Sequence, residues 1–211
     1  MISPTKPKTI VYIDGFNFFH GALKGTRYQW IDLHKLSEIL LPNHDIQKIN
    51  YYTARLDKRP GNRNAPRNQQ IYFRALETLP SVEIILGLFR THEVQMRRSR
   101  ASGKEWVWKT EEKGSDVNIG NDMIRDACFK HYECAVLLSN DSDLARTVDT
   151  VVLDFGLQVG VVNPFRKKPT AKLVRNASFK RTIRSNSVLK RAQFPNRLQD
   201  EKGVFHKPKG W

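Results

Sequence analysis

The stretch CAVLLSNDSD, residues 134–143, gives the clearest indication of the fold. Five apolar residues in a row, Cys134 to Leu138, predict a short strand buried on both faces, which is typical of a parallel sheet. The strand is followed at once by two acids, Asp141 and Asp143. Ligands of open α/β sheets gather at the carboxyl ends of strands, so a functional site is expected here.

Apolar strands followed by helices recur along the chain. Further strands are predicted at 9–13, 46–54, 82–89 and 157–162, and helices at 16–23, 32–41, 68–79, 115–129 and 144–155. Gly156 follows the last helix in the position favoured for a left-handed C-cap. This alternation predicts an α/β fold with a mainly parallel central sheet and helices on both faces. We expect one domain over 8–195, a basic hairpin-like excursion at about 90–113, and an irregular C-terminal tail at 196–211.

Two further acids are expected at the same edge of the sheet. Asp14 follows the strand at 9–13, and Asp116 lies at the start of the helix at 115–129. Clustered carboxylates repel one another and raise each other's pKa unless a cation lies among them. Oxygen ligands suit Mg²⁺ or Mn²⁺, which can activate water and stabilise a leaving oxygen. The four acids therefore predict a catalytic metal site.

Each acid alone also has a structural interpretation. Asp14-Gly15 can simply be a turn. Asp116 can be the N-cap of its helix, and either Asp141 or Ser142 can cap the helix that follows the central strand. The functional interpretation depends on the joint pattern, in which every acid falls at the end of a predicted element.

The charge of the chain favours a polyanionic partner. The formal net charge is +15, and from Arg166 onward 14 Lys and Arg stand against 2 Asp and Glu. A solvated tail that aids solubility is the alternative. Basic residues interleaved with aromatic ones suit single-stranded nucleic acid. The alternative is that the tryptophans pack on the body of the protein. The candidate nucleic-acid-binding residues are Arg97, Arg98, Arg100, Lys104, Trp106, Trp108, Arg166, Lys167 and Lys168.

Several other classes of protein are disfavoured. The two cysteines form no CxxC pair, no zinc spacing of His and Cys occurs, and no Gly-x-Gly-x-x-Gly loop follows a strand. No apolar run approaches the roughly 20 residues of a membrane-spanning helix. The first nine residues contain no apolar core of a signal peptide. We therefore expect a cytoplasmic protein with reduced thiols and no membrane partner.

Three segments together resemble the NYN domain family, a branch of the PIN-like nuclease superfamily. They read YIDGFN at 12–17, TEEKGSDVN at 110–118 and LSNDSDL at 138–144. The segments GLQVGVV at 156–162, Phe194-Pro195 and KPKGW at 207–211 also fit the bacterial form of the domain. The resemblance covers nearly the whole chain.

The resemblance implies a PIN-like fold and a metal-dependent endonuclease that hydrolyses RNA. It places Asp14, Asp116, Asp141 and Asp143 in the catalytic metal site, with Asn17, Ser139 and Asn140 at neighbouring polar positions and Asp122 as a further acid. Lys113 either contacts a phosphate or pairs with one of these carboxylates. A homodimer is compatible with the resemblance.

Three questions stay open at this point. A non-catalytic RNA-binding or assembly module of the same fold would keep the acids, and an enzyme acting on a small molecule is a lower-ranked alternative. The sequence does not distinguish an RNA substrate from a DNA substrate, because metal–phosphate chemistry is common to both. Only contact with a 2′-hydroxyl would distinguish them.

Overall fold

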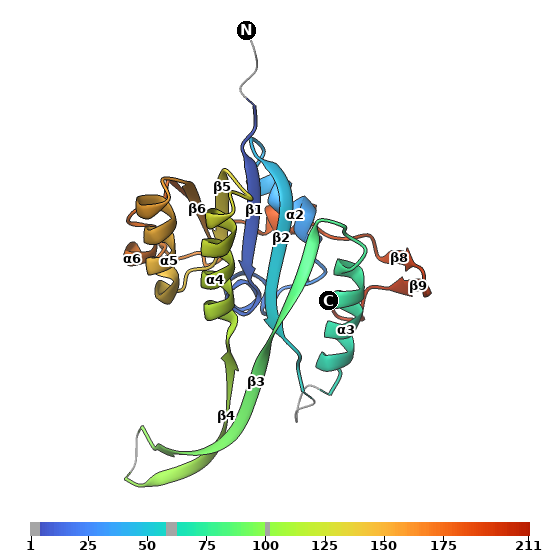
Figure 1. Cartoon of the computed structure of the whole chain (residues 1–211). Helices are drawn as coiled ribbons and strands as arrows, with labels where there is room; N and C mark the ends of the chain where they lie inside the picture. Colours follow the sequence, from blue (N-terminus) through green and yellow to red (C-terminus); the bar gives the residue numbers. More distant parts are fainter. Residues whose placement is uncertain (1–4, 58–62, 100–101) are drawn as a thin grey trace.

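The computed structural model of the chain describes residues 5–57, 63–99 and 102–211 (Figure 1). The central sheet has the strand order β4-β3-β2-β1-β5-β6-β7. All neighbours in it are parallel except β3 and β4, which are antiparallel. Its strands are β1 (Lys8–Asp14), β2 (Asp45–Ala54), β3 (Val82–Arg97), β4 (Lys104–Lys113), β5 (Cys134–Leu138), β6 (Gln158–Asn163) and β7 (Phe179–Thr182).

Helices pack on both faces of this sheet, as the sequence predicts. They are α1 (Gly15–Phe18), η1 (Phe19–Leu23), α2 (Leu33–Leu40), α3 (Ala65–Leu76), α4 (Ser115–Cys128), η2 (Ser142–Leu144), α5 (Ala145–Asp149), η3 (Thr150–Asp154), α6 (Ala171–Val174) and α7 (Asn186–Arg191). The mixed α/β architecture with six parallel strands confirms the predicted PIN-like fold class.

The central strand β1 divides the core into two layers, because successive side chains of a strand point to opposite faces. Val11 and Ile13 belong to the layer that contains α1, α2, α3 and α7. Ile10 and Tyr12 belong to the layer that contains α4, α5 and α6. Both faces of β1 are thus buried, which explains why its sequence is an unbroken apolar run.

The excursion expected at about 90–113 is a long hairpin. Strand β3 continues to Arg97, well past the predicted end at residue 89, and pairs with β4 from Leu88↔Lys113 to Arg97↔Lys104. The hairpin extends away from the body of the protein in Figure 1. It carries the chain from the edge of the sheet to the start of α4.

The prediction of an irregular tail at 196–211 is wrong. Strands β8 (Arg197–Asp200) and β9 (Gly203–His206) form a second, two-stranded sheet. The Arg74 guanidinium of α3 donates hydrogen bonds of 2.6 and 2.5 Å to the two carboxylate oxygens of Asp200, and it also lies over the ring of Phe205. These contacts attach the tail to the body, and they depend on a distant helix that local sequence patterns do not reveal.

Candidate metal centre and nucleic-acid interface

Asp14 lies at the carboxyl end of β1 and is buried. Its Oδ1 accepts a hydrogen bond of 2.9 Å from the backbone N–H of Asn17, and its Oδ2 accepts one of 3.0 Å from the Ser139 hydroxyl. The carboxylate therefore caps α1 and is fixed in direction by the neighbouring strand β5. The capping role of Asp14 is compatible with a place in a candidate site at the carboxyl end of β1.

Close packing against β2 explains why a glycine, Gly15, follows Asp14. A β-carbon at Gly15 would lie 2.5 Å from the carbonyl oxygen of Tyr52 and 2.8 Å from the Tyr51 ring. The residue begins α1 in close contact with β2, and this contact keeps Asp14 at the edge of the sheet.

A chain of hydrogen bonds links the first and third sequence segments. The Asn17 side-chain oxygen accepts from the backbone N–H of Asn140 at 2.9 Å, and the Ser139 hydroxyl accepts from the N–H of Asp141 at 3.1 Å. These hydrogen bonds join the segment that follows β1 to the segment that follows β5.

Asp141 and Asp143 flank the first turn after β5. The Asp141 carboxylate accepts a hydrogen bond of 3.0 Å from the backbone N–H of Asp143, so Asp141 caps η2. Asp141 is half-buried and Asp143 is exposed. The cap uses Oδ1 of Asp141.

Asp116 lies in the first turn of α4, two residues after Gly114, whose φ of +96° lies in the left-handed region that favours glycine. Partial desolvation, and then the negative charges of Asp141 and Asp143, raise the pKa of Asp116. These charges act on Asp116 because α4 contacts η2, the turn that follows β5 and begins just after Asp141. A cation among them would relieve that repulsion, so the donor chemistry fits a hard divalent ion.

The carboxylates do not form a closed ligand cage. Among the residues that the structure describes, no group of three or more His, Cys, Asp or Glu is arranged closely enough to hold a metal ion. The acids would therefore have to move before they could converge on one ion. Asp116 and Asp143 have room to rotate, because both are exposed.

Replacing Asp116 with asparagine is expected to stabilise the metal-free protein. A raised pKa means that the ionised form disfavours the fold: the penalty is absent below the ordinary pKa of aspartate and is complete above the raised pKa. At neutral pH in chelator, Asp116→Asn should melt at most about 2–4 °C above wild type, since exposure limits the effect. The difference should shrink as the pH falls, and a lower melting temperature of the variant at neutral pH would contradict the repulsion.

Asp122, expected as a further acid of the site, is held by other partners. It accepts a hydrogen bond of 2.9 Å from the Tyr52 hydroxyl and forms a 3.0 Å ion pair with Arg125. One turn further along α4, the buried Asp126 accepts a 2.7 Å hydrogen bond from the Tyr12 hydroxyl. Sequence reasoning missed Asp126, although its spacing from Asp122 places both acids on one face of α4.

The exposed hairpin carries the first group of candidate nucleic-acid-binding residues. Trp106 and Trp108 are 63% and 70% exposed, so the interpretation that they pack on the body is wrong. Residues directly opposite in an antiparallel pair share a face, and the register therefore places Arg97 and Lys104 on the face that bears the two tryptophans. Arg98 forms a 3.4 Å ion pair with Glu105. Arg100 lies outside the described residues.

The second basic group lies close to the carboxylates. Arg166, Lys167 and Lys168 are exposed in the loop that follows β6, the strand next to β5. This loop is tied to the end of β5, because the backbone N–H of Thr170 donates to the Asn140 side-chain oxygen at 2.7 Å. Lys113, also exposed, ends β4 just before Gly114 and Asp116.

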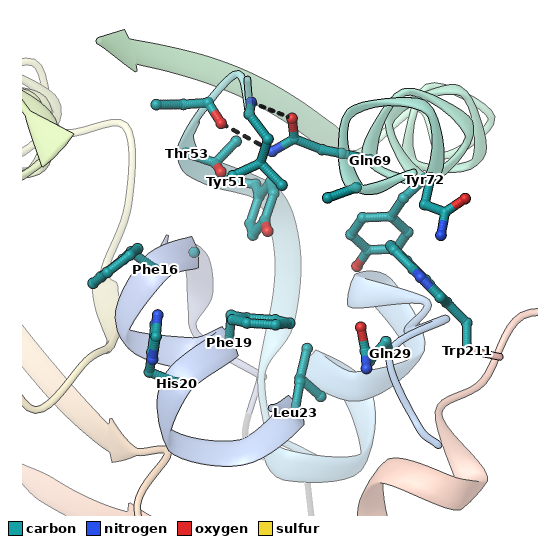
Figure 2. A pocket seen from close by; sticks show the side chains of 15 residues that line it. Phe16, Phe19, His20, Leu23, Gln29, Tyr51, Thr53, Gln69, Tyr72 and Trp211 are labelled. Atoms are coloured by element: carbon teal, nitrogen blue, oxygen red, sulfur yellow. Dashed lines mark hydrogen bonds between the residues drawn. The ribbon is translucent and has the colours of Figure 1, made fainter. Parts of the chain in front are cut away.

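A pocket that the sequence did not indicate opens beside Asp14. It has a volume of about 390 Å³, and Gly15 is part of its wall. Figure 2 shows Phe16, Phe19 and His20 on one side, Tyr72 and Trp211 on the other, and Tyr51 between them. The lining comes from α1, η1, β2, α3 and the end of the chain, and a set so scattered leaves no local pattern to detect.

The sheet order, the helices on both faces and the acids at the ends of β1 and β5 define a PIN-like, nuclease-like α/β fold. The chain belongs to the NYN domain family, whose model matches residues 8–186. The described helices include none that is long and apolar enough to cross a membrane.

Two known proteins are similar over most of this chain. The first is HspA of Pseudomonas putida, a 6-hydroxy-3-succinoylpyridine 3-monooxygenase, which is 28% identical and matches 97% of this chain and 75% of HspA. The second is the crystal structure of VPA0982, a protein of unknown function from Vibrio parahaemolyticus. It covers 97% of this chain and 100% of VPA0982, with a TM-score of 0.58 and 16% identity, and it shows the fold alone.

Proposed function

We propose that this protein is a divalent-metal-dependent endoribonuclease that hydrolyses phosphodiester bonds of single-stranded RNA. The observation that carries the proposal is the contact of α4 with η2, which brings Asp116 near Asp141 and Asp143. Partial desolvation, and then these two negative charges, raise the pKa of Asp116. Asp14 is linked to the same turn through the Ser139 hydroxyl, which donates to Asp14 and accepts from the Asp141 N–H. Natural proteins rarely retain such repulsion without a use for it, and it makes the edge a candidate functional site.

Each part of the site has a role in this mechanism. Asp14, Asp116, Asp141 and Asp143 would hold Mg²⁺ or Mn²⁺, while Ser139 and Asn17 keep the strand ends in place. When bound, the ion supplies activation of water and stabilisation of charge on the phosphate. Arg166, Lys167 and Lys168 attract the RNA backbone, and their loop keeps the scissile phosphate next to the carboxylates.

The test uses a circular single-stranded RNA and a circular DNA of the same sequence, incubated with Mn²⁺, Mg²⁺ or a chelator. We expect linear RNA products with either metal and none with the chelator, because only an endonuclease opens a circle. RNA binding without cleavage in any metal would refute the nuclease and favour the RNA-binding module. Equal cleavage of the DNA circle would refute the preference for RNA.

The hairpin is expected to increase the affinity for RNA. Trp106 and Trp108 are exposed on a face that also bears Arg97 and Lys104, and each base stacked on a ring contributes about 1–3 kcal/mol. The double variant Trp106→Ala, Trp108→Ala should therefore bind single-stranded RNA roughly 5-fold more weakly or worse, with an unchanged melting temperature. Fluorescence anisotropy measures the affinity, and unchanged binding would remove the hairpin from the interface.

A second candidate function is oxygenation of a small heteroaromatic compound. The name of HspA specifies a pyridine substrate, and the aromatic pocket beside Asp14 has room for one such ring. Incubation with 6-hydroxy-3-succinoylpyridine, oxygen and a reduced nicotinamide or flavin tests this directly by mass spectrometry of the products. Turnover in that assay together with intact RNA circles would favour the oxygenase over the nuclease.

A further inference from the structure

The lining of the pocket beside Asp14 is rich in aromatic residues: Phe16, Phe19, Tyr51, Tyr72 and Trp211. Among the residues that the structure describes, no Asp, Glu, Lys or Arg lines it. A phosphate or a metal ion would find no opposite charge there, so the occupant must be neutral. A volume of about 390 Å³ lies in the range of pockets that enclose small ligands, roughly 300–1,000 Å³.

The shape and chemistry of the walls fit a flat ring. Phe16 and Phe19 line the pocket and are 48% and 36% exposed, so apolar ring surface faces the opening. The His20 ring lies 4.3 Å from the Phe16 ring, and partial desolvation, then Lys24, lower the pKa of His20, which favours the uncharged imidazole. Thr53, Asn68 and Gln29 add polar groups for the edge of a ring.

The pocket is also built to keep its form. The side chain of Gln69 accepts a hydrogen bond of 2.8 Å from the Leu56 N–H and donates one of 2.9 Å to the Ala54 carbonyl oxygen, which joins α3 to the end of β2 (Figure 2). On the far wall, the Trp211 ring contacts Tyr72 and the buried Trp30. A preformed pocket loses little freedom when a ligand binds.

We propose that this pocket binds one unpaired nucleobase of the RNA, next to the phosphate held at the carboxylates. The inference rests on the proposed function. Gly15 both follows Asp14 and lines the pocket, so a base placed there belongs to a nucleotide adjacent to the site of cleavage. The base stacks on Phe19, with Tyr72 and Trp211 opposite, and the ribose-phosphate stays outside among the basic residues. RNA with paired bases cannot enter, which makes the protein specific for single strands.

The test measures binding rather than cleavage. Fluorescein-labelled RNA hexamers, each with one abasic position, are titrated with the full-length Asp141→Asn protein so that the RNA stays intact. We expect one abasic position to weaken binding roughly 5- to 150-fold, the range of a lost base–aromatic stack, while the others have small effects. In the Phe19→Ala background, binding should be weaker by a similar factor and insensitive to that position, since the two changes remove one interaction.

Controls separate stacking from a loss of structure. Phe19→Tyr should restore the affinity, and Phe129→Ala, which removes a 68% exposed phenylalanine outside the pocket, should bind like its parent. A flat abasic scan, or a Phe19→Ala protein that keeps its sensitivity to the abasic position, would overturn the proposal. RNA cleavage with a flat scan would refute the pocket alone, whereas a position-specific scan without cleavage would refute only the nuclease.

A parallel titration with adenosine and uridine tests whether the pocket binds a base within RNA or a free heteroaromatic compound. Weak binding of nucleosides that depends on Phe19, together with a position-specific scan of the hexamers, supports the base pocket. Nucleoside binding with a flat scan would show that the pocket takes a free heteroaromatic compound, and that outcome would overturn the proposal for RNA.

Discussion

Asp141→Asn is expected to reduce the rate of metal-dependent RNA cleavage by about 100-fold or more. Substitution of groups that merely support metal ligands already costs 10- to 100-fold in many sites, so loss of a ligand's charge should cost at least that much. The asparagine oxygen can still accept the hydrogen bond from the Asp143 N–H that caps η2. The fold and the affinity for RNA should therefore persist, and the loss should appear in the cleavage rate.

The matched control is Asp154→Asn. Asp154 is an exposed acid of η3, the helical segment that follows α5, and it lies away from the carboxylate edge. Its substitution makes the same change in net charge and should leave the cleavage rate within a factor of two or so. Equal cleavage by Asp141→Asn and wild type would exclude Asp141 from the site, and equal losses in both variants would indicate a general effect of charge.

Trp30→Ala is expected to lower the free energy of unfolding by about 3–5 kcal/mol, the cost of removing a large aromatic side chain from a core. Trp30 is fully buried, and its indole N–H donates a 2.9 Å hydrogen bond to the Pro195 carbonyl oxygen. It also contacts Phe194 and Trp211. The substitution therefore leaves a cavity and removes the support of the C-terminal segment together.

Trp108→Ala provides the comparison within the same chain. Trp108 is 70% exposed on the hairpin, so its loss should change the free energy of unfolding by less than about 0.5 kcal/mol. Urea unfolding of both variants measures the difference. A Trp30→Ala protein with the midpoint of wild type would mean that the layer around α2, α3 and α7 is not packed as described.

The sheet and its acids could be predicted because each depends on local sequence. Cys134 to Leu138 is uninterrupted and apolar since β5 is buried on both faces, and Asp14 and Asp141 follow their strands directly. The ends of parallel neighbours meet at one edge of a sheet, so the proximity of these acids followed from the predicted topology.

The parts that could not be predicted depend on contacts between distant segments. The strands β8 and β9 have four residues each, and the ion pair of Arg74 with Asp200 attaches this small sheet to α3. The pocket unites residues as far apart as Gly15 and Trp211. The exposure of Trp108 was likewise hidden, because alternation within a strand says which residues share a face but not whether that face is covered.

The proposed nuclease function depends most on whether the four carboxylates hold a divalent ion. Crystals of the wild-type protein containing Mn²⁺, at a concentration that supports RNA cleavage, give an anomalous difference map that locates the metal directly. We predict a peak among Asp14, Asp116, Asp141 and Asp143, with Asp143 rotated toward it from its exposed position. A map with no peak at these acids, or with manganese bound only elsewhere, would contradict the proposed metal centre.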